Sequence, residues 1–431
     1  MRFLHKSDVP SIDKTAKETG HLFGKGKNND IETERYLNLN TLRKPEIFYS
    51  EIGSLSKDRV EKAHRLFNKF ENYQIPVVTV KGREKSEVGT IFERINNTGT
   101  DLDTLDLMIA WTWSSDFNLR EEIESILAVA DEKGFGDIER KRVLQCISAI
   151  AVERISTDDI LDSLNQPEEI SSLLNRVRDS LGRAIDLLVN EFNIYGLKFL
   201  PSTFQIIPLV YLFSNVGATR FEHTKKVRKW FWRTSFTSRY RDATNQRVRE
   251  DISFFAEVAD NSSNVRADQF DVEVTTSRFF VDTKFHSRAS ATKAFILMLA
   301  QNKPQDLWSG EKISLNQTIS SYSRKEYHHV FPRQYLYDHG YDQSLVDCLA
   351  NRCLITSDTN KRISQKPPSE YLFDREGGLF DDMGQYDETK KEILRSNLLP
   401  ADLDIYRNND YQKFLSERKD ILYEYFTDLV D

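Results

Sequence analysis

The stretch EYHHVFP, residues 326–332, decides how the second half of this chain is interpreted. It sets two adjacent histidines, His328 and His329, in a short segment that ends in apolar residues and a proline. On a strand, neighbouring side chains point to opposite faces. A twisted strand end or a bulge still lets one imidazole bind a metal while the next holds a water molecule, so that both serve the same phosphate.

Two asparagines follow this pair, Asn351 and Asn360, and they frame the short apolar piece 352–356. Hydrolysis of a phosphodiester needs a base for the attacking water, a hard divalent cation on the phosphate, and oxygen or nitrogen ligands for that cation. A histidine pair followed by two asparagines can supply the base and the nitrogen and oxygen ligands. Chance also produces His-His pairs and turn asparagines, so spacing alone leaves open that no site exists.

Each of these side chains has an expected role. Imidazole titrates near neutral pH, so we expect His329 to be the base and Asn351 to orient it by a hydrogen bond. We expect His328 and the Asn360 carbonyl oxygen to bind Mg²⁺ or Mn²⁺. Three cations just after Asn360 are candidates for binding the phosphates of a nucleic acid: Lys361, Arg362 and Lys366.

Composition excludes several classes of protein. The 431 residues carry 60 Lys and Arg against 67 Asp and Glu, a net charge of -7, and 39% are hydrophobic. That length allows roughly two to four domains with real cores. The three cysteines include no CxxC pair, so neither a disulfide framework nor a cysteine-based zinc site is expected. A structural zinc module built from His328, His339, Cys348 and Cys353 is the weakest alternative.

The apolar segments are too short to cross a membrane. The longest, residues 204–213, is interrupted by Gln205 and Pro208, and it predicts a buried helix instead. The first residues lack the apolar stretch of a secretion signal. We therefore expect a cytoplasmic protein with no membrane partner.

Helical periodicity dominates residues 119–259, and a basic segment lies inside it. Residues 225–249 contain nine Lys or Arg and one acid, Asp242. One interpretation is a nucleic-acid surface formed by Arg228, Lys229 and Arg233. The other, which we favour, is a set of core aromatics with basic side chains around them: Trp230, Phe231, Phe236 and Tyr240.

The residues from 328 to 360 resemble the HNH, or ββα-metal, nuclease domain of the GmrSD-type restriction endonucleases. The matching pieces are 328–332, 351–355 and Asn360, in the order of the family motif. The resemblance implies DNA as substrate, His329 as general base, and His328 and Asn360 as metal ligands.

Residues 91–102, IFERINNTGTDL, resemble a segment of the ParB-like N-terminal domain of the same family. The Asp-Gly-Gln-(Gln/Lys)-Arg motif of that domain has no counterpart in this sequence. Arg94 and Asn96 are therefore expected either to form a remnant site or to serve as a salt bridge and a turn residue. We expect no NTP-dependent activity, and a chain whose gene begins inside the ancestral domain.

Together these features predict a predominantly helical α+β protein with three parts. They are a partial ParB-like domain (1–115), a helical domain (116–270) and an HNH-like nuclease domain (271–431). The expected function is metal-dependent cleavage of foreign DNA, base-modified DNA included, in a restriction or phage-defence system. The alternative is a non-catalytic or partner-dependent DNA-binding subunit, with a second subunit supplying the missing motif.

Overall fold

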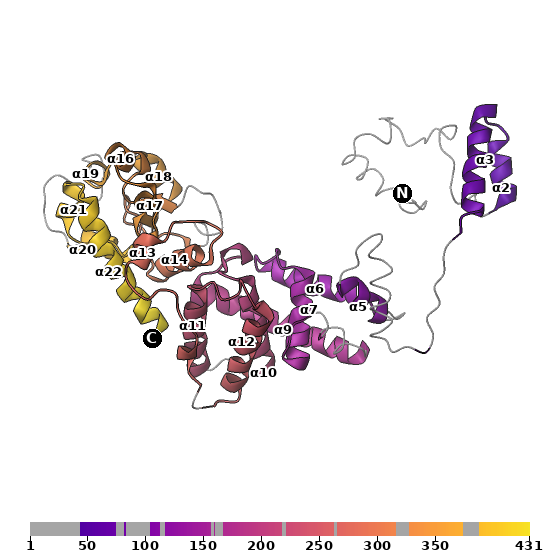
Figure 1. Cartoon of the computed structure of the whole chain (residues 1–431), viewed down its shortest axis with the longest axis horizontal. Coiled ribbons are helices and arrows are strands. Elements are labelled where there is room, and N and C mark those ends of the chain that lie inside the picture. Colours follow the sequence, from indigo (N-terminus) through magenta and orange to yellow (C-terminus); the bar gives the residue numbers. More distant parts are fainter. Residues whose placement is uncertain are drawn as a thin grey trace. The chain divides into compact units, whose positions relative to one another are not determined.

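Helices make up most of the residues that the computed structural model describes (Figure 1), as the sequence predicts. The structure describes residues 44–74, 82, 104–112, 117–156, 159, 167–217, 221–262, 265–315, 327–373 and 388–431. The chain divides into two compact units, residues 1–83 and 84–431. Two sequence predictions lie outside the described residues: a strand at the β-branched run 75–80, and a turn at residues 96–99, Asn-Asn-Thr-Gly.

The first unit contains a pair of helices, α2 (Pro45–Ile52) and α3 (Lys57–Glu71). Their small core holds Phe48, Ile52, Ala63 and Phe67, with the rings of Phe48 and Phe67 stacked at 4.7 Å. Helical spacing places Ala63, Leu66, Phe67 and Phe70 on one face of α3. Ala63 and Phe67 of this face are buried, whereas Phe70 is 40% exposed.

The second unit begins with a series of helices and short 3₁₀ turns. Residues 204–213 fall largely in α10, which is buried from Ile206 to Phe213 and confirms the predicted buried helix. This helix packs against α7, α9 and α12. The elements of this part are α5 (Thr104–Thr112), α6 (Leu119–Glu132), α7 (Arg140–Val152), α9 (Pro167–Phe192), η3 (Leu197–Phe199), η4 (Thr203–Gln205), α10 (Ile206–Asn215), α11 (Phe221–Ser235), α12 (Thr244–Ala259) and η5 (Ala267–Gln269).

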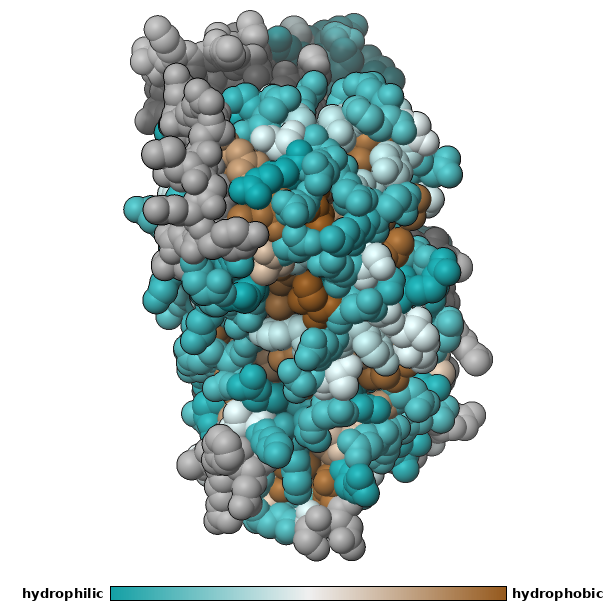
Figure 2. All heavy atoms as spheres, turned by 90° about the vertical axis from the view of Figure 1, so that its left-hand side faces the viewer, coloured by the Kyte–Doolittle hydropathy of each residue, from teal (hydrophilic) through white to brown (hydrophobic). Residues whose placement is uncertain are grey.

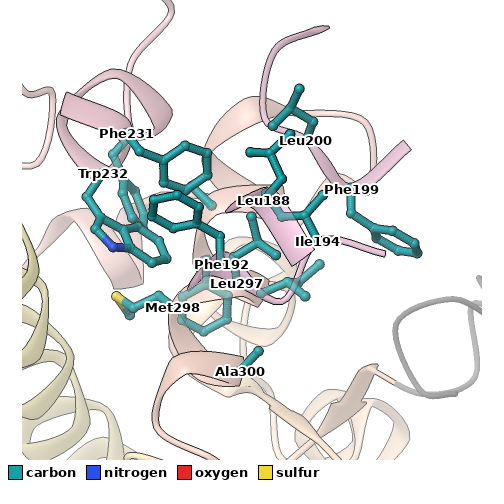
Figure 3. Close-up of a cluster of buried hydrophobic side chains, with 14 of the residues drawn as sticks. Leu188, Phe192, Ile194, Phe199, Leu200, Phe231, Trp232, Leu297, Met298 and Ala300 are labelled. Atoms are coloured by element: carbon teal, nitrogen blue, oxygen red, sulfur yellow. The ribbon is translucent and has the colours of Figure 1, made fainter. Parts of the chain in front are cut away.

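The aromatic residues of the favoured interpretation, on α11 and just after it, pack in or against the core, as that interpretation predicts. Trp230, Phe231 and Phe236 have no exposed surface, and Tyr240 packs against the core from a partly buried position. Figure 3 shows Phe231 facing Phe192 of α9, and their ring centroids are 4.0 Å apart. The packing of these aromatic rings therefore fixes this part of α11 against the core.

The last part of the chain carries the sheet. Within the described residues there is one two-stranded sheet, formed by β1 (Tyr327–His329) and β2 (Arg352–Leu354). The helical elements around it are α13 (Phe279–Asp282), α14 (Ser290–Gln301), α16 (Arg333–Asp338), α17 (Gln343–Val346), η6 (Leu349–Asn351), α18 (Ser357–Ile363), α19 (Pro368–Tyr371), α20 (Glu388–Ser396), α21 (Leu403–Arg407) and α22 (Tyr411–Val430).

One hydrophobic core extends from Leu105 to Val430 and joins all of these elements. The long helix α22 contacts α11, α13 and η6, so it connects the middle helices to the region of the sheet. The boundaries expected at residues 115 and 270 stay predictions, because two domains can share a core. The face seen in Figure 2 is mostly hydrophilic, with apolar side chains visible in small areas between polar ones. None of the helices in the described ranges is long and apolar enough to cross a bilayer.

Candidate active site

The histidine pair lies in an arrangement of two paired strands followed by a helix. Strand β1 pairs antiparallel with β2, which sets His328 opposite Cys353 and His329 opposite Arg352. Helix α18 begins three residues after β2, and it carries Asn360. Because neighbouring strand residues point to opposite faces, the two imidazoles have different surroundings.

His328 faces Asn360. The imidazole Nδ1 lies 3.0 Å from the Asn360 side-chain oxygen, and only 6% of His328 is exposed. Since an amide oxygen accepts and cannot donate, this hydrogen bond requires the proton on Nδ1 and leaves a lone pair on Nε2. That Nε2 is buried and has no partner among the residues that the structure describes. Burial lowers the pKa of His328 to about 4, although the hydrogen bond that His328 donates to Asn360 opposes this shift, so the ring is neutral at pH 7.

His329 faces Asp347 instead. Its Nε2 lies 3.2 Å from Asp347 Oδ1, and 17% of the His329 side chain remains exposed. Burial, followed by the nearby Arg352 charge, holds the pKa of His329 below its usual range, although the contact with Asp347 opposes this shift. A neutral, partly accessible imidazole has the protonation state that a general base requires.

The Asp347 carboxylate accepts from four side chains, and His329 is one of them. Oδ1 also lies 3.3 Å from Arg352 Nη2, while Oδ2 accepts from Arg333 Nη2 at 3.2 Å and from Gln343 Nε2 at 3.4 Å. Burial alone raises the pKa of this carboxyl, but the contact with His329 and the charges of Arg333 and Arg352 outweigh it and keep the pKa low. The side chain is therefore an ionised acceptor at neutral pH.

Asp347 and Arg333 are site residues that the sequence interpretation missed. A signal for Asp347 was present, because it is a single acid between the buried residues Val346 and Cys348, and an acid in such a run is rarely buried without partners. Arg333 follows His329 by four positions and is half exposed, beside the base. Its own position in the sequence gave no comparable signal.

Asn351 has a different role from the one that the sequence suggested. Its side-chain oxygen accepts from Phe331 N at 2.9 Å, and its amide donates to the carbonyl oxygens of Phe331 and Val346 at 3.1 and 3.0 Å. Asn351 thus fixes the backbone just after β1, and Asp347 rather than Asn351 contacts His329. The prediction of an Asn351 to His329 hydrogen bond is corrected accordingly, because the asparagine is fully buried among backbone groups.

A buried acid from an earlier turn holds α18 in place. Asp306, which is 1% exposed, accepts from the Thr359 hydroxyl at 2.6 Å and from Thr356 N at 2.9 Å. Thr356 caps the helix by accepting from Thr359 N. These bonds set the start of α18 and therefore the position of Asn360, one turn later.

The donor set fits a divalent cation with few protein ligands. Two ligands about 2.1 Å from an octahedral ion are about 3.0 Å apart at neighbouring corners, and Mg²⁺ usually keeps several waters. The separation of His328 Nδ1 and Asn360 Oδ1 matches that spacing. A cation bound at Nδ1 would replace the hydrogen bond to Asn360 and would require the other tautomer of His328, with the proton on Nε2. In the described part of the chain, no group of three His, Cys, Asp or Glu side chains is arranged to hold a metal ion, so water and substrate oxygens would complete the shell.

The residues of the alternative zinc module have other contacts. Cys353 Sγ lies 3.9 Å from the His328 carbonyl oxygen, Cys348 Sγ lies 4.0 Å from the Tyr411 hydroxyl, and His339 Nδ1 lies 2.7 Å from the Tyr335 carbonyl oxygen. The zinc hypothesis gains no support from these contacts.

The expected nucleic-acid ligands fall into two sets. Lys361, Arg362 and Lys366 are all exposed, on α18 or just after it. On α11, Arg228 is paired with Glu191 at 3.3 Å, and Arg233 donates to the carbonyl oxygens of Phe270, Val430 and Asp268. The Arg233 guanidinium is thus occupied within the protein, whereas the cations near α18 face solvent. Lys229 is partly exposed, and Arg94 and Asn96 lie outside the described residues.

Comparison with known proteins finds a distant relative. The chain is 25% identical to the uncharacterized protein MJ0686 of Methanocaldococcus jannaschii, over 98% of this chain and 77% of that protein. No protein-family model matches the sequence.

Proposed function

We propose that this protein is a metal-dependent DNA endonuclease of the HNH class. The observation that carries the proposal is the pairing of His328 with Asn360 at 3.0 Å across β1 and α18, with His329 on the opposite face of the same strand. Two paired strands followed by a helix are the arrangement that the resemblance to the ββα-metal nucleases implies. The ligand pair, the base and the helix occur here in the order of that motif.

The chain's own residues suit hydrolysis of a phosphodiester. Neutral His329 accepts a proton from water as the water oxygen bonds to phosphorus. The bond from phosphorus to one ester oxygen breaks, and that oxygen leaves with the electron pair and takes a proton from solvent. A divalent cation held by His328 and Asn360 would stabilise the negative charge on the phosphate. Asn351 keeps the backbone after β1 in place.

DNA is the proposed substrate because cations surround this site. Arg333 is half exposed beside His329, and Lys361 and Arg362 follow Asn360 directly on α18. A guanidinium or ammonium group at such a position can neutralise a backbone phosphate. The resemblance to GmrSD-type enzymes adds the proposal that the DNA is foreign, base-modified DNA included, and that the setting is restriction or phage defence in the cytoplasm.

Plasmid cleavage tests the proposal. Purified parent protein, His329→Ala and His339→Ala are incubated with Mg²⁺ or Mn²⁺ on unmodified and cytosine-modified DNA, with EDTA in a parallel series. General base catalysis contributes roughly 10²–10⁴-fold, so His329→Ala should lose most of the activity. His339→Ala is the matched control, since this exposed histidine lies outside the cluster.

Two results would contradict the proposal. Cutting by His329→Ala at the parent rate would remove His329 from the mechanism. Absence of cutting by folded parent protein on both DNAs would favour the alternative, a DNA-binding subunit that depends on a second chain for its activity.

A further inference from the structure

We propose that Asp347 is a positioning residue, which holds the proton of His329 on Nε2 and so makes Nδ1 the nitrogen that accepts a proton from water. The inference rests on the proposed function for the identity of the reaction. The tautomer itself is a property of the protein without substrate. It is therefore testable whether or not the protein cuts DNA.

The first argument is the direction of the hydrogen bond. Asp347 Oδ1 lies 3.2 Å from His329 Nε2. An ionised carboxylate only accepts, so the imidazole must donate through Nε2. A neutral imidazole carries one ring proton, and Nδ1 is then left with a free lone pair.

The second argument is that donors occupy all of the lone-pair positions of the Asp347 carboxylate. A carboxylate has about four lone-pair positions, and Asp347 has four donors: His329, Arg352, Arg333 and Gln343. Arg and Gln supply these bonds through nitrogens that always carry protons. The two arginines keep the buried acid ionised, and an ionised acid requires the proton to stay on the histidine.

The third argument is the rigidity of the position. Asp347 follows α17 directly, and its carbonyl oxygen accepts from Phe285 N at 2.8 Å. Its side chain is only 7% exposed, and Arg352, the cross-strand neighbour of His329, contacts the same carboxylate oxygen. A carboxylate fixed on both its backbone and its side chain defines one orientation for the imidazole that it contacts.

Access to the other nitrogen completes the case. No hydrogen bond to His329 Nδ1 occurs among the described residues, and 17% of the side chain is exposed. Water can therefore reach part of the ring, and Nδ1 is not among the buried side-chain atoms that lack a partner in the described residues. In this scheme Asp347 stays unprotonated throughout, and it stabilises the imidazolium that forms when Nδ1 accepts the proton.

The experiment measures the His329 tautomer directly. Full-length, metal-free protein labelled with ¹⁵N is examined at pH 7 by long-range ¹H–¹⁵N correlation, and His329→Ala identifies the signals of this ring among the 8 histidines. The parent should show Nε2 protonated and Nδ1 unprotonated. Asp347→Asn places an amide beside Nε2, so the ring should lose its preference for that tautomer, while Asp347→Glu should retain it.

A cleavage assay supplies the second readout. Since general base catalysis contributes roughly 10²–10⁴-fold, Asp347→Asn should lower kcat at least about tenfold with little change in KM. Asp347→Glu should recover part of the loss, and Asp358→Asn, an exposed acid on α18, should match the parent.

Three outcomes separate the two proposals. Protonation of Nδ1 in the parent overturns the role of Asp347, and so does an unchanged tautomer in Asp347→Asn. If Asp347→Asn fails to fold, the parent spectrum and Asp347→Glu still decide the assignment. A parent that shows the expected tautomer but cuts no DNA contradicts the endonuclease and leaves the Asp347 to His329 arrangement standing.

Discussion

Asp306 and Thr359 are 53 residues apart in the chain, yet the Thr359 hydroxyl donates a 2.6 Å hydrogen bond to the Asp306 carboxylate. The same carboxylate accepts from the backbone of Thr356, the N-cap of α18. A buried acid outside the motif therefore sets the start of the helix that carries Asn360. The site depends on this contact as much as on its own residues.

Replacing Asp306 by Asn should cost about 1–3 kcal/mol of stability, because an amide presents donors where Thr356 and Thr359 also donate. Urea unfolding at pH 7 measures the loss. Asp358→Asn is the control, since Asp358 is exposed and pairs only with Lys361 among the described residues. Equal stability of the parent and Asp306→Asn at pH 7 would contradict the role given to Asp306.

The difference in stability between the parent and Asp306→Asn should depend on pH. Burial raises the pKa of Asp306, but hydrogen bonds from Thr359, Thr356, Ser309 and Trp308 outweigh burial and keep the pKa below its usual value. A lowered folded-state pKa stabilises the protein above the unfolded pKa, about 3.9 for Asp, and this contribution disappears as the pH falls through the folded pKa. The stability gap between parent and Asp306→Asn should therefore be full at pH 7 and shrink below about pH 4.

Arg418 should be more important for stability than its neighbours on α22. It has no exposed surface, and its Nη1 and Nη2 atoms donate to the carbonyl oxygens of Ala350 and Arg352 at 2.8 and 2.6 Å. Arg418→Met leaves these buried acceptors without donors, at roughly 1–3 kcal/mol for each. Thermal or urea unfolding tests this, with Lys413→Met, whose exposed ion pair with Asp402 should matter little, as the control.

The preference of the cleavage reaction for Mn²⁺ or Mg²⁺ should depend on His328. Imidazole nitrogen favours transition metals such as Mn²⁺ over Mg²⁺, which prefers oxygen ligands. We expect faster cleavage with Mn²⁺ than with Mg²⁺ in the parent. Asp in place of His328 supplies an oxygen ligand and should shift the preference toward Mg²⁺, while Asn360→Ala should lose activity with both ions.

The measurement is the cleavage rate against the concentration of each ion. Losses of metal-site residues or of their immediate partners typically cost on the order of 10–100-fold in affinity or activity. The same ratio of Mn²⁺ to Mg²⁺ activity in the parent and His328→Asp would show that His328 is not a ligand.

Local patterns in the sequence predicted those parts of the structure that depend on local spacing. The helical spacing of Trp230, Phe231 and Phe236 indicated a buried face, and all three are buried. The His328 to Asn360 pairing was expected from a motif, in which residue types and order carry the information. Both inferences needed only residues that are close in sequence or that belong to one recognisable pattern.

Contacts between distant segments left no such pattern. Arg233 was one candidate for contact with nucleic acid, but it donates to the backbone of Val430, which is 197 residues away. Asp306 looks like an ordinary surface acid until the fold brings Thr359 to it. The apolar neighbours of Asp347 suggest that this acid is buried, but they do not identify His329 as its partner. Their partners are chosen by tertiary packing, which a period of 3.6 or 2 residues does not encode.

The placement of charges around the site leads to a last prediction, about the surface that binds DNA. Lys361, Arg362 and Lys366 face solvent, whereas Arg228 is paired with Glu191 and Arg233 with three backbone carbonyls. A cation that binds a phosphate releases a counterion from DNA, and each such contact adds about 0.9 to the slope of log affinity against log salt. The ion pair of Lys361 with Asp358 is exposed on both sides, so it holds this lysine only weakly. The three cations near α18 should therefore contribute up to about 2.7 to that slope.

The test compares two variants of catalytically inactive His329→Ala protein. In the first, Lys361, Arg362 and Lys366 are all changed to Gln, and in the second Arg228 and Lys229 are changed to Gln. Binding to a short duplex is measured between low and moderate salt. The first variant should lose most of the slope and the second little, because the first set of cations lies on and just after α18, next to Asn360, whereas Arg228 on α11 is paired with Glu191. The opposite ranking would place the DNA on α11, and equal slopes in all three proteins would show that neither set of cations contacts phosphate.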